Sequence, residues 1–310
     1  MKTLQTLFLF LASLLSLFPH PAAAQSAAAY AVADAATGHL LATSHAEKKL
    51  QIGSLTKIAT LMVVLDWADL SKSDLGTMAT VPPAAVAIAG ANPIGFQPGD
   101  QLSLRDLIYA AILQSDNVAA YTLAMHVGRA LGQTKPGVAP VELFVAQMNA
   151  LARKLGMQHT KFLNPHGLDY VEQPYSSAHD LVRLSSYAMK RAAFRFYVSQ
   201  KDRRIARHLA NGEQAGYNLA NTNELLGIND IDGVKTGSTS RAGECLVISA
   251  ARSPEAQQNA DGSVTVTPRR LIVVVLGATK RFDTGFALLN NGWNLYDQWA
   301  AAGRPLEKHE

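Results

Sequence analysis

The chain has 310 residues, of which 48% are hydrophobic and 17% are charged, and its formal net charge is +4. This length and composition predict an ordinary globular protein with a sizeable core, built as one large domain or two small ones. Lysine and arginine are scattered along the chain and never form a run of five, so the positive charge does not indicate a nucleic-acid-binding protein.

The N-terminus has the three parts of a secretory signal peptide: a basic residue, Lys2, then the apolar run "LFLFLASLLSLF", then a small-residue site that ends at Ala24. The apolar run is shorter than the ~20 residues that span a bilayer, which disfavours a membrane anchor. We therefore expect export, cleavage after Ala24, and one extracytoplasmic domain over residues 25–310 without a stable membrane anchor. That domain would lie in the periplasm if the source is Gram-negative.

The first half of the mature chain is predicted to be mainly helical. A β-hairpin is expected from Tyr30 to Thr43, because polar and apolar residues alternate around a Gly-containing turn. The segment from Ser54 to Trp67 is apolar on every side, which indicates a core helix. Prolines and glycines over residues 81–100 indicate a loop. Further helices are expected over 103–113, over 117–131, over 140–156 and from Ser177 onwards, where Ser177 and Asp180 are spaced as a helix cap.

The last third of the chain changes to strand patterns. Three strands are expected at "GVKTG", "GECLVISAAR" and "RRLIVVVLGA", with a polar hairpin between the second and third and a final helix from Phe282 to Trp299. The single cysteine, Cys245, is expected to be a buried strand thiol and cannot form an intrachain disulfide. Strands at both ends and helices between them predict an α+β fold with one antiparallel sheet covered by helices.

Ser54 and Lys57 are three residues apart in the predicted core helix, so they share a face. Burial of a lysine favours its neutral amine, and a neutral amine can accept the proton of a neighbouring serine hydroxyl. The pair is therefore a candidate nucleophile with its base. Ser-x-x-Lys alone is a weak signal, and a serine at a helix start beside a solvated lysine is the simpler explanation of the motif by itself.

Two further short motifs occur once each. Ser115-Asp116-Asn117 lies at the break between two predicted helices, where a hydroxyl and an amide can project into a cleft, although helix capping by Ser115 or Asn117 is the simpler explanation. Lys235-Thr236-Gly237 ends a predicted strand, where a glycine turn alone would explain it. The three motifs in this order are the signature of penicillin-binding proteins and class A β-lactamases.

With these motifs the chain resembles a serine-type D-alanyl-D-alanine carboxypeptidase or endopeptidase of the low-molecular-mass penicillin-binding protein family. The stretches "QPGDQLSLRDLIYAAILQSDN", "FLNPHGLD", "NTNELL" and "DGVKTGSTSRAGECLVISA" support the resemblance, which covers about residues 28–297. It implies a DD-peptidase/β-lactamase-like fold with a buried central helix. Longer family members add a C-terminal β-domain and a membrane-binding helix, so this chain is more like the short members.

The resemblance also implies a role for each matching residue. Ser54 would attack the carbonyl between two D-alanines of a peptidoglycan stem peptide, Lys57 would take its proton, and Ser115 with Lys235 would pass a proton to the leaving amine. The remaining residues would bind substrate: Asn117 the substrate amide, the backbone N–H groups of Ser54 and Ser238 the oxyanion, and Thr236 and Gly237 of the strand, with Arg281, the terminal carboxylate. β-Lactam antibiotics would acylate Ser54, and no metal or cofactor is implied.

The sequence departs from the family pattern in ways that keep alternatives open. Asp116 stands where many of these carboxypeptidases have glycine, as in a β-lactamase, but the residue four before Asn164 is Thr160 and not the glutamate that a class A β-lactamase needs. His166 is expected to be a loop residue that lines the cleft, not a base. A β-lactamase and a non-catalytic peptidoglycan-binding protein remain as alternatives, and the sequence does not separate carboxypeptidase from endopeptidase action.

Overall fold

The computed structural model describes residues 26–88, 90, 92–133, 137–169, 171 and 173–306. The predicted signal peptide, residues 1–24, lies outside the described residues. Within the described part of the chain, no helix is both long enough and apolar enough to cross a membrane.

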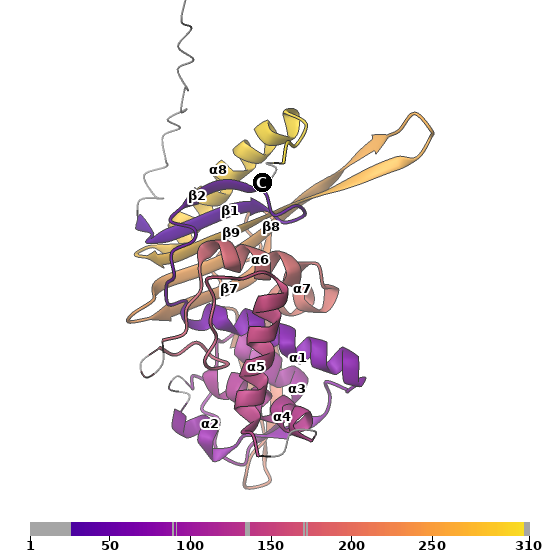
Figure 1. The fold of residues 1–310 in the computed structure, drawn as a ribbon. Coiled ribbons are helices and arrows are strands. Elements are labelled where there is room, and N and C mark those ends of the chain that lie inside the picture. Colours follow the sequence, from indigo (N-terminus) through magenta and orange to yellow (C-terminus); the bar gives the residue numbers. More distant parts are fainter. Residues whose placement is uncertain are drawn as a thin grey trace, which may run out of the picture.

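A five-stranded antiparallel sheet forms the centre of the upper half of the molecule in Figure 1, with strand order β2-β1-β9-β8-β7. Its central strands are apolar on both faces because helices cover both faces. The strands are β1 (Ala29–Asp34), β2 (Leu40–Ser44), β7 (Ile231–Thr239), β8 (Gly243–Gln258) and β9 (Val264–Ala278). The predicted N-terminal hairpin, the three later strands and the antiparallel sheet are confirmed.

Helices pack on each face of this sheet. The C-terminal helix α8 (Arg281–Ala301) covers one face, and α6 (Ala178–Met189) covers the other together with the helical half of the molecule (Figure 1). Two separate clusters of buried apolar side chains result, one on each face. The cap predicted for α6 is present, since the Ser177 hydroxyl accepts a hydrogen bond from the Asp180 N–H at 3.2 Å.

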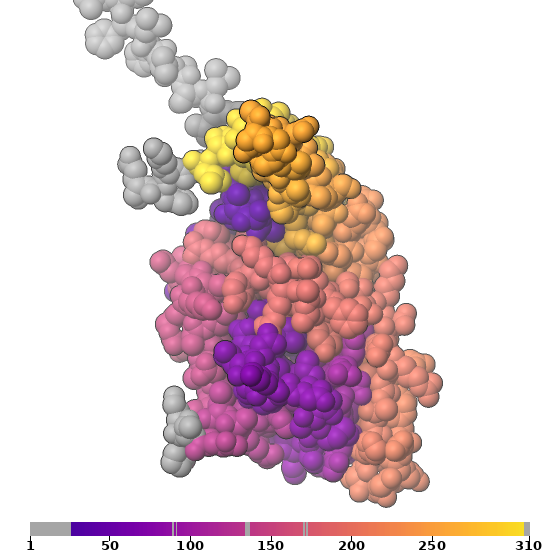
Figure 2. All heavy atoms as spheres, turned by 90° about the vertical axis from the view of Figure 1, so that its right-hand side faces the viewer, coloured from indigo at the N-terminus to yellow at the C-terminus, as the bar shows by residue number. Residues whose placement is uncertain are grey.

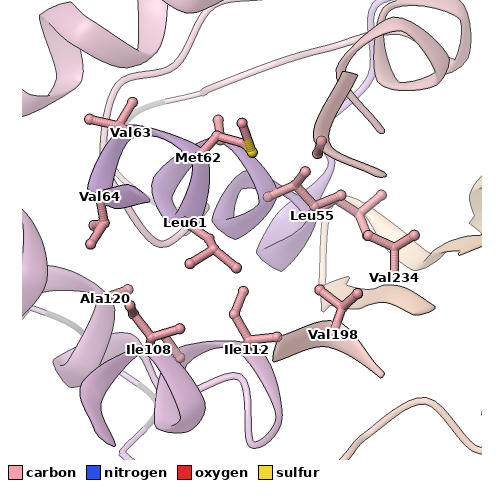
Figure 3. Packing of buried hydrophobic residues seen from close by; sticks show 14 of the residues in the cluster. Leu55, Leu61, Met62, Val63, Val64, Ile108, Ile112, Ala120, Val198 and Val234 are labelled. Carbon is pink, nitrogen blue, oxygen red and sulfur yellow. The ribbon is translucent and has the colours of Figure 1, made fainter. Parts of the chain in front are cut away.

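The helical half surrounds α1 (Lys57–Ser71), which follows a short 3₁₀ turn, η2 (Gly53–Thr56). Residues 57–65 of α1 are all buried, as predicted for a core helix. Figure 3 shows Leu61 of α1 facing Ile108 and Ile112 across the core, with Leu55 towards Val234 of β7. The other helices are α2 (Pro83–Ile88), α3 (Leu104–Ile112), α4 (Asn117–Gly132), α5 (Pro140–Lys154) and α7 (Ala192–Val198).

A second antiparallel sheet lies at the far end of the helical half, and the expectation of a single sheet was wrong in this respect. Its four strands run in the order β3-β4-β5-β6, namely β3 (Met78–Thr80), β4 (Gln101–Ser103), β5 (Asp202–His208) and β6 (Gln214–Ala220). Ile205 and Leu219 are the only fully buried residues of β5 and β6, so the apolar alternation is weak. The β5–β6 hairpin (salmon) and the long β8–β9 hairpin (orange) lie at opposite ends of the molecule in both views (Figures 1 and 2).

Candidate active site

The turn that carries Ser54 packs directly against strand β7. A Cβ atom on Gly237 would lie 2.7 Å from the carbonyl oxygen of Ile52 and 3.2 Å from the backbone nitrogen of Ser54. A Cβ atom on Gly53 would likewise lie 3.2 Å from the backbone nitrogen of Ser238. Only glycine allows so close an approach of two backbones, and the Ser54 turn therefore lies directly against the part of β7 that carries Ser238.

Lys57 lies beneath Ser54 and is fully buried. Its Nζ donates hydrogen bonds to Ser54 Oγ at 2.8 Å, Asn117 Oδ1 at 2.6 Å and the His166 carbonyl oxygen at 3.0 Å. Burial lowers the pKa of Lys57 to about 7, although the nearby Asp116 carboxylate acts in the opposite direction. Near neutral pH, therefore, a substantial fraction of the Lys57 amines are unprotonated and can accept a proton from Ser54.

The Ser115-Asp116-Asn117 turn is shaped by two local features. Ser115 has a φ of 60°, in the left-handed region that non-glycine residues rarely adopt. Asp116 caps α4, with its Oδ1 accepting from the Ala119 N–H at 2.8 Å. The simpler explanation considered for this motif, capping by Ser115 or Asn117, does not hold, because Asp116 is the capping residue. Asp116 caps the helix, Ser115 lines the cleft, and the Oδ1 atom of Asn117 accepts a hydrogen bond from Lys57 Nζ.

Strand β7 supplies a second buried amine. Lys235 is 2% exposed, and its Nζ donates to the Thr236 carbonyl oxygen at 3.1 Å. Its pKa lies well below the usual value, first because of burial and then because Lys57 and Arg281 are positively charged. The neighbouring Thr236 hydroxyl lies 2.6 Å from the hydroxyl of Thr222.

Arg281, the first residue of α8, reaches the same strand. Its Nη1 donates to the Gly237 carbonyl oxygen at 3.2 Å, and its backbone N–H donates to Glu244 Oε2 at 2.9 Å. Its Nε is buried and has no hydrogen-bond partner among the described residues. Arg281 also lines the cleft, so its guanidinium can bind an anionic group there.

These side chains converge on one cavity of about 520 Å³. The cavity brings together seven of the nine residues predicted to form the site, and the other two, Lys57 and Lys235, are buried with their Nζ atoms bonded to Ser54 and Thr236. Its lining comprises Ser54, Asn92, Pro93, Gln114, Ser115, Asn117, His166, Gly167, Leu168, Thr222, Thr236, Gly237, Ser238, Thr239 and Arg281. Thr222 was not predicted as a site residue, although "NTNELL" was one of the stretches that carried the family resemblance.

His166 lies in a loop that packs on the nucleophile turn. A Cβ atom on Gly167 would be 1.9 Å from the Gly53 carbonyl oxygen, so the loop and the turn are in direct contact. The Nδ1 atom of His166 accepts from the Leu168 N–H at 3.2 Å. Burial, and then the charge of Lys57, lower the pKa of His166 to about 3, so the ring is neutral at any physiological pH. Its carbonyl oxygen, not its ring, holds Lys57.

No group of three His, Cys, Asp or Glu side chains able to hold a metal ion occurs among the residues that the structure describes. A second hollow of about 510 Å³ lies between α1, α4 and α5. It is lined mainly by apolar side chains and contains none of the motif residues, so the chemistry is concentrated in the first cavity.

Comparison with known proteins identifies the family of the chain. The family model described as D-alanyl-D-alanine carboxypeptidase, peptidase family S11, matches residues 18–280. The chain is 33% identical to the D-alanyl-D-alanine carboxypeptidase DacC of Escherichia coli over 281 residues, which cover 87% of this chain and 62% of DacC. Several such relatives are longer, and the chain spans between half and two thirds of their length.

Solved structures share the fold. The crystal structure of the Streptomyces K15 DD-transpeptidase superposes with a TM-score of 0.72 at 30% identity, covering 87% of this chain and 97% of that one. Penicillin-binding protein D2 from Listeria monocytogenes, in its ampicillin-bound form, gives a TM-score of 0.66 at 27% identity, covering 87% and 96%. The predicted fold class is therefore confirmed, and the chain belongs to the S11 family of D-alanyl-D-alanine carboxypeptidases.

Proposed function

We propose that the protein is a serine DD-peptidase that hydrolyses D-Ala peptide bonds of peptidoglycan stem peptides through an acyl-enzyme on Ser54. The observation that carries the proposal is the 2.8 Å contact between Lys57 Nζ and Ser54 Oγ, with the pKa of that buried amine at about 7. A base whose pKa lies near the working pH is unprotonated in a useful fraction of the molecules and is still basic enough to take the proton.

In the acylation step, Ser54 Oγ bonds to the carbonyl carbon of the penultimate D-alanine and its proton passes to Lys57. Asn117 Oδ1, the His166 carbonyl oxygen and the Asp116 carboxylate then stabilise the new ammonium group. The N–H groups of Ser54 and Ser238 face the developing oxyanion, and each such donor contributes roughly 3 kcal/mol in comparable hydrolases.

The C–N bond then breaks, and the leaving amine needs a proton. Ser115 lines the cavity and Lys235 lies buried beside it, so we assign the proton delivery to this pair. The carboxylate of the leaving D-alanine is bound by the Thr236 hydroxyl and the Arg281 guanidinium, since both residues line the cavity. Asn117 would also bind the amide of the acyl side of the substrate.

β-Lactams are expected to acylate Ser54 and to remain bound. The side chain of Thr160 stands at the position of the β-lactamase glutamate, and its hydroxyl is engaged with Asp180 Oδ2 and Ser176 Oγ, both at 2.7 Å. A hydroxyl in this setting does not replace a carboxylate base, which disfavours fast β-lactam hydrolysis. The ampicillin-bound form of the Listeria neighbour supports the binding of β-lactams in this proposal.

We further propose that the protein is exported, with residues 1–24 removed, and that it acts on the cell wall. N-terminal sequencing of the protein from the periplasm or medium tests this, and a chain that retains Met1 in the cytoplasm would contradict it.

The function is tested by labelling with a fluorescent penicillin and by digestion of purified muropeptides. Wild-type protein should be labelled, Ser54→Ala should not, and the digest should release free D-Ala or lose dimeric muropeptides. Release of D-Ala would assign carboxypeptidase action and loss of dimers endopeptidase action. An unlabelled wild type that leaves both substrates intact would contradict the proposal and favour a binding protein.

A further inference from the structure

The segment Asn221-Thr222-Asn223, between β6 and β7, is built by its two asparagines. The Asn221 side chain donates to the Val198 and Gln200 carbonyl oxygens at 3.3 and 2.9 Å. The Asn223 side chain donates to the Gly233 carbonyl oxygen at 3.1 Å. Their amide oxygens accept the N–H groups of Asn223 and Leu225, so both side chains serve to fix the backbone.

Thr222 is the one residue of this segment whose side chain lines the cavity. Its backbone N–H donates to the Leu113 carbonyl oxygen at 3.0 Å, which ties the segment to the end of α3. Its hydroxyl lies 2.6 Å from the Thr236 hydroxyl, near the short end of the range for O–H···O bonds. A rigid support therefore holds one hydroxyl against the hydroxyl that we assign to carboxylate binding.

The direction of this bond determines what Thr236 can do. Each hydroxyl has one hydrogen to donate and two lone pairs to accept with. If Thr236 donated to Thr222, it would have no hydrogen left for a substrate carboxylate. If Thr222 donates to Thr236, the Thr236 hydrogen can point into the cavity and bind the substrate carboxylate. The hydrogen bond from Thr222 then polarises the Thr236 O–H group and strengthens its bond to the carboxylate.

We propose that Thr222 is a positioning residue that donates its hydroxyl hydrogen to Thr236 and thereby makes the site selective for peptides with a free C-terminal carboxylate. This inference rests on the proposed DD-peptidase function and extends it to substrate choice. Hydrogen bonds to a charged acceptor are stronger than those to a neutral one, so the effect is largest for a carboxylate.

The test compares two peptides, one ending in D-Ala-D-Ala and one ending in the C-terminal amide of the same sequence. Thr222→Val keeps the shape of the side chain and removes the hydroxyl. It should lower kcat/KM by about tenfold for the carboxylate peptide and by much less for the amide, so that the discrimination between the two falls. Thr222→Ser should restore the wild-type discrimination.

Two further variants serve as controls. Thr265→Val, in the exposed outer part of the β8–β9 hairpin, should leave both rates unchanged. Thr222→Ala provides a second loss of the hydroxyl in case the valine variant does not fold, as judged by its melting temperature.

If Thr222→Val lowered kcat/KM equally for the two peptides, the role of Thr222 would be merely structural and the inference would be overturned. Unchanged kcat/KM values in both Thr222→Val and Thr222→Ala would also overturn it. A wild-type protein that is neither labelled by penicillin nor active on the carboxylate peptide would instead overturn the proposed function, and the inference with it.

Discussion

Alanine at position 237 should disable acylation while leaving the protein folded. The added Cβ would lie 2.7 Å from the Ile52 carbonyl oxygen and 3.2 Å from the nitrogens of Ser54 and Leu55. Strand β7 and the nucleophile turn must then separate by roughly half an ångström, and such overpacking costs about 1–3 kcal/mol of stability. A typical domain has 5–15 kcal/mol of stability, so most molecules stay folded.

The same displacement moves the N–H groups of Ser54 and Ser238 apart, and loss of one oxyanion donor lowers the rate about 10²–10³-fold. Stopped-flow measurement of the second-order acylation rate constant with a fluorescent penicillin, together with thermal denaturation, separates the two effects. The matched control is Gly132→Ala at the end of α4, where alanine is a better helix former and the nearest atom is Leu143 Cδ1 at 3.3 Å. A Gly237→Ala variant that acylates within about threefold of wild type would refute the proposed oxyanion site.

Three further outcomes follow, two from the buried charge of Asp116 and one from the residue at position 160. Asp116→Asn keeps a good helix cap but removes the carboxylate that raises the Lys57 pKa. When the acylation rate constant is plotted against pH, its acid limb should therefore move to lower pH. An unchanged pH of half-maximal rate would contradict this. Burial raises the Asp116 pKa to about 6, so its contribution to stability is full below pH 3.8 and is lost as the pH rises through 6. The asparagine variant should therefore gain melting temperature relative to wild type at pH 8 but not at pH 3.5, and the opposite order would count against the assignment. Intact-mass spectrometry should find a lasting penicillin adduct, because Thr160 is not a base; rapid nitrocefin turnover would show otherwise.

Sequence patterns predicted the parts of the fold in which burial is continuous. The apolar run of α1 and the run "LIVVVL" of β9 are continuously buried, so their composition alone identifies them. The second sheet was missed because β5 and β6 are exposed on one face and bury one side chain each, Ile205 and Leu219. Short elements such as α7, with seven residues, carry too few periods of the pattern to be recognised.

At the site, the motifs predicted which residues meet but not how. Ser-x-x-Lys gave the helical contact between Ser54 and Lys57, since three residues is one turn. The left-handed φ of Ser115 and the capping role of Asp116 depend on the junction between α3 and α4, which spacing does not specify. Thr222 was overlooked because a threonine between two asparagines is typical of a turn, and its contact with Thr236 joins residues fourteen apart.

The pH dependence of the single-turnover acylation of Ser54 tests the central claim most directly. If the neutral Lys57 amine is the base, the second-order rate constant should be nearly level above about pH 7 and should fall about tenfold for each pH unit below it. A rate constant that stays level from pH 5 to pH 8 would contradict the assignment of Lys57 as the base.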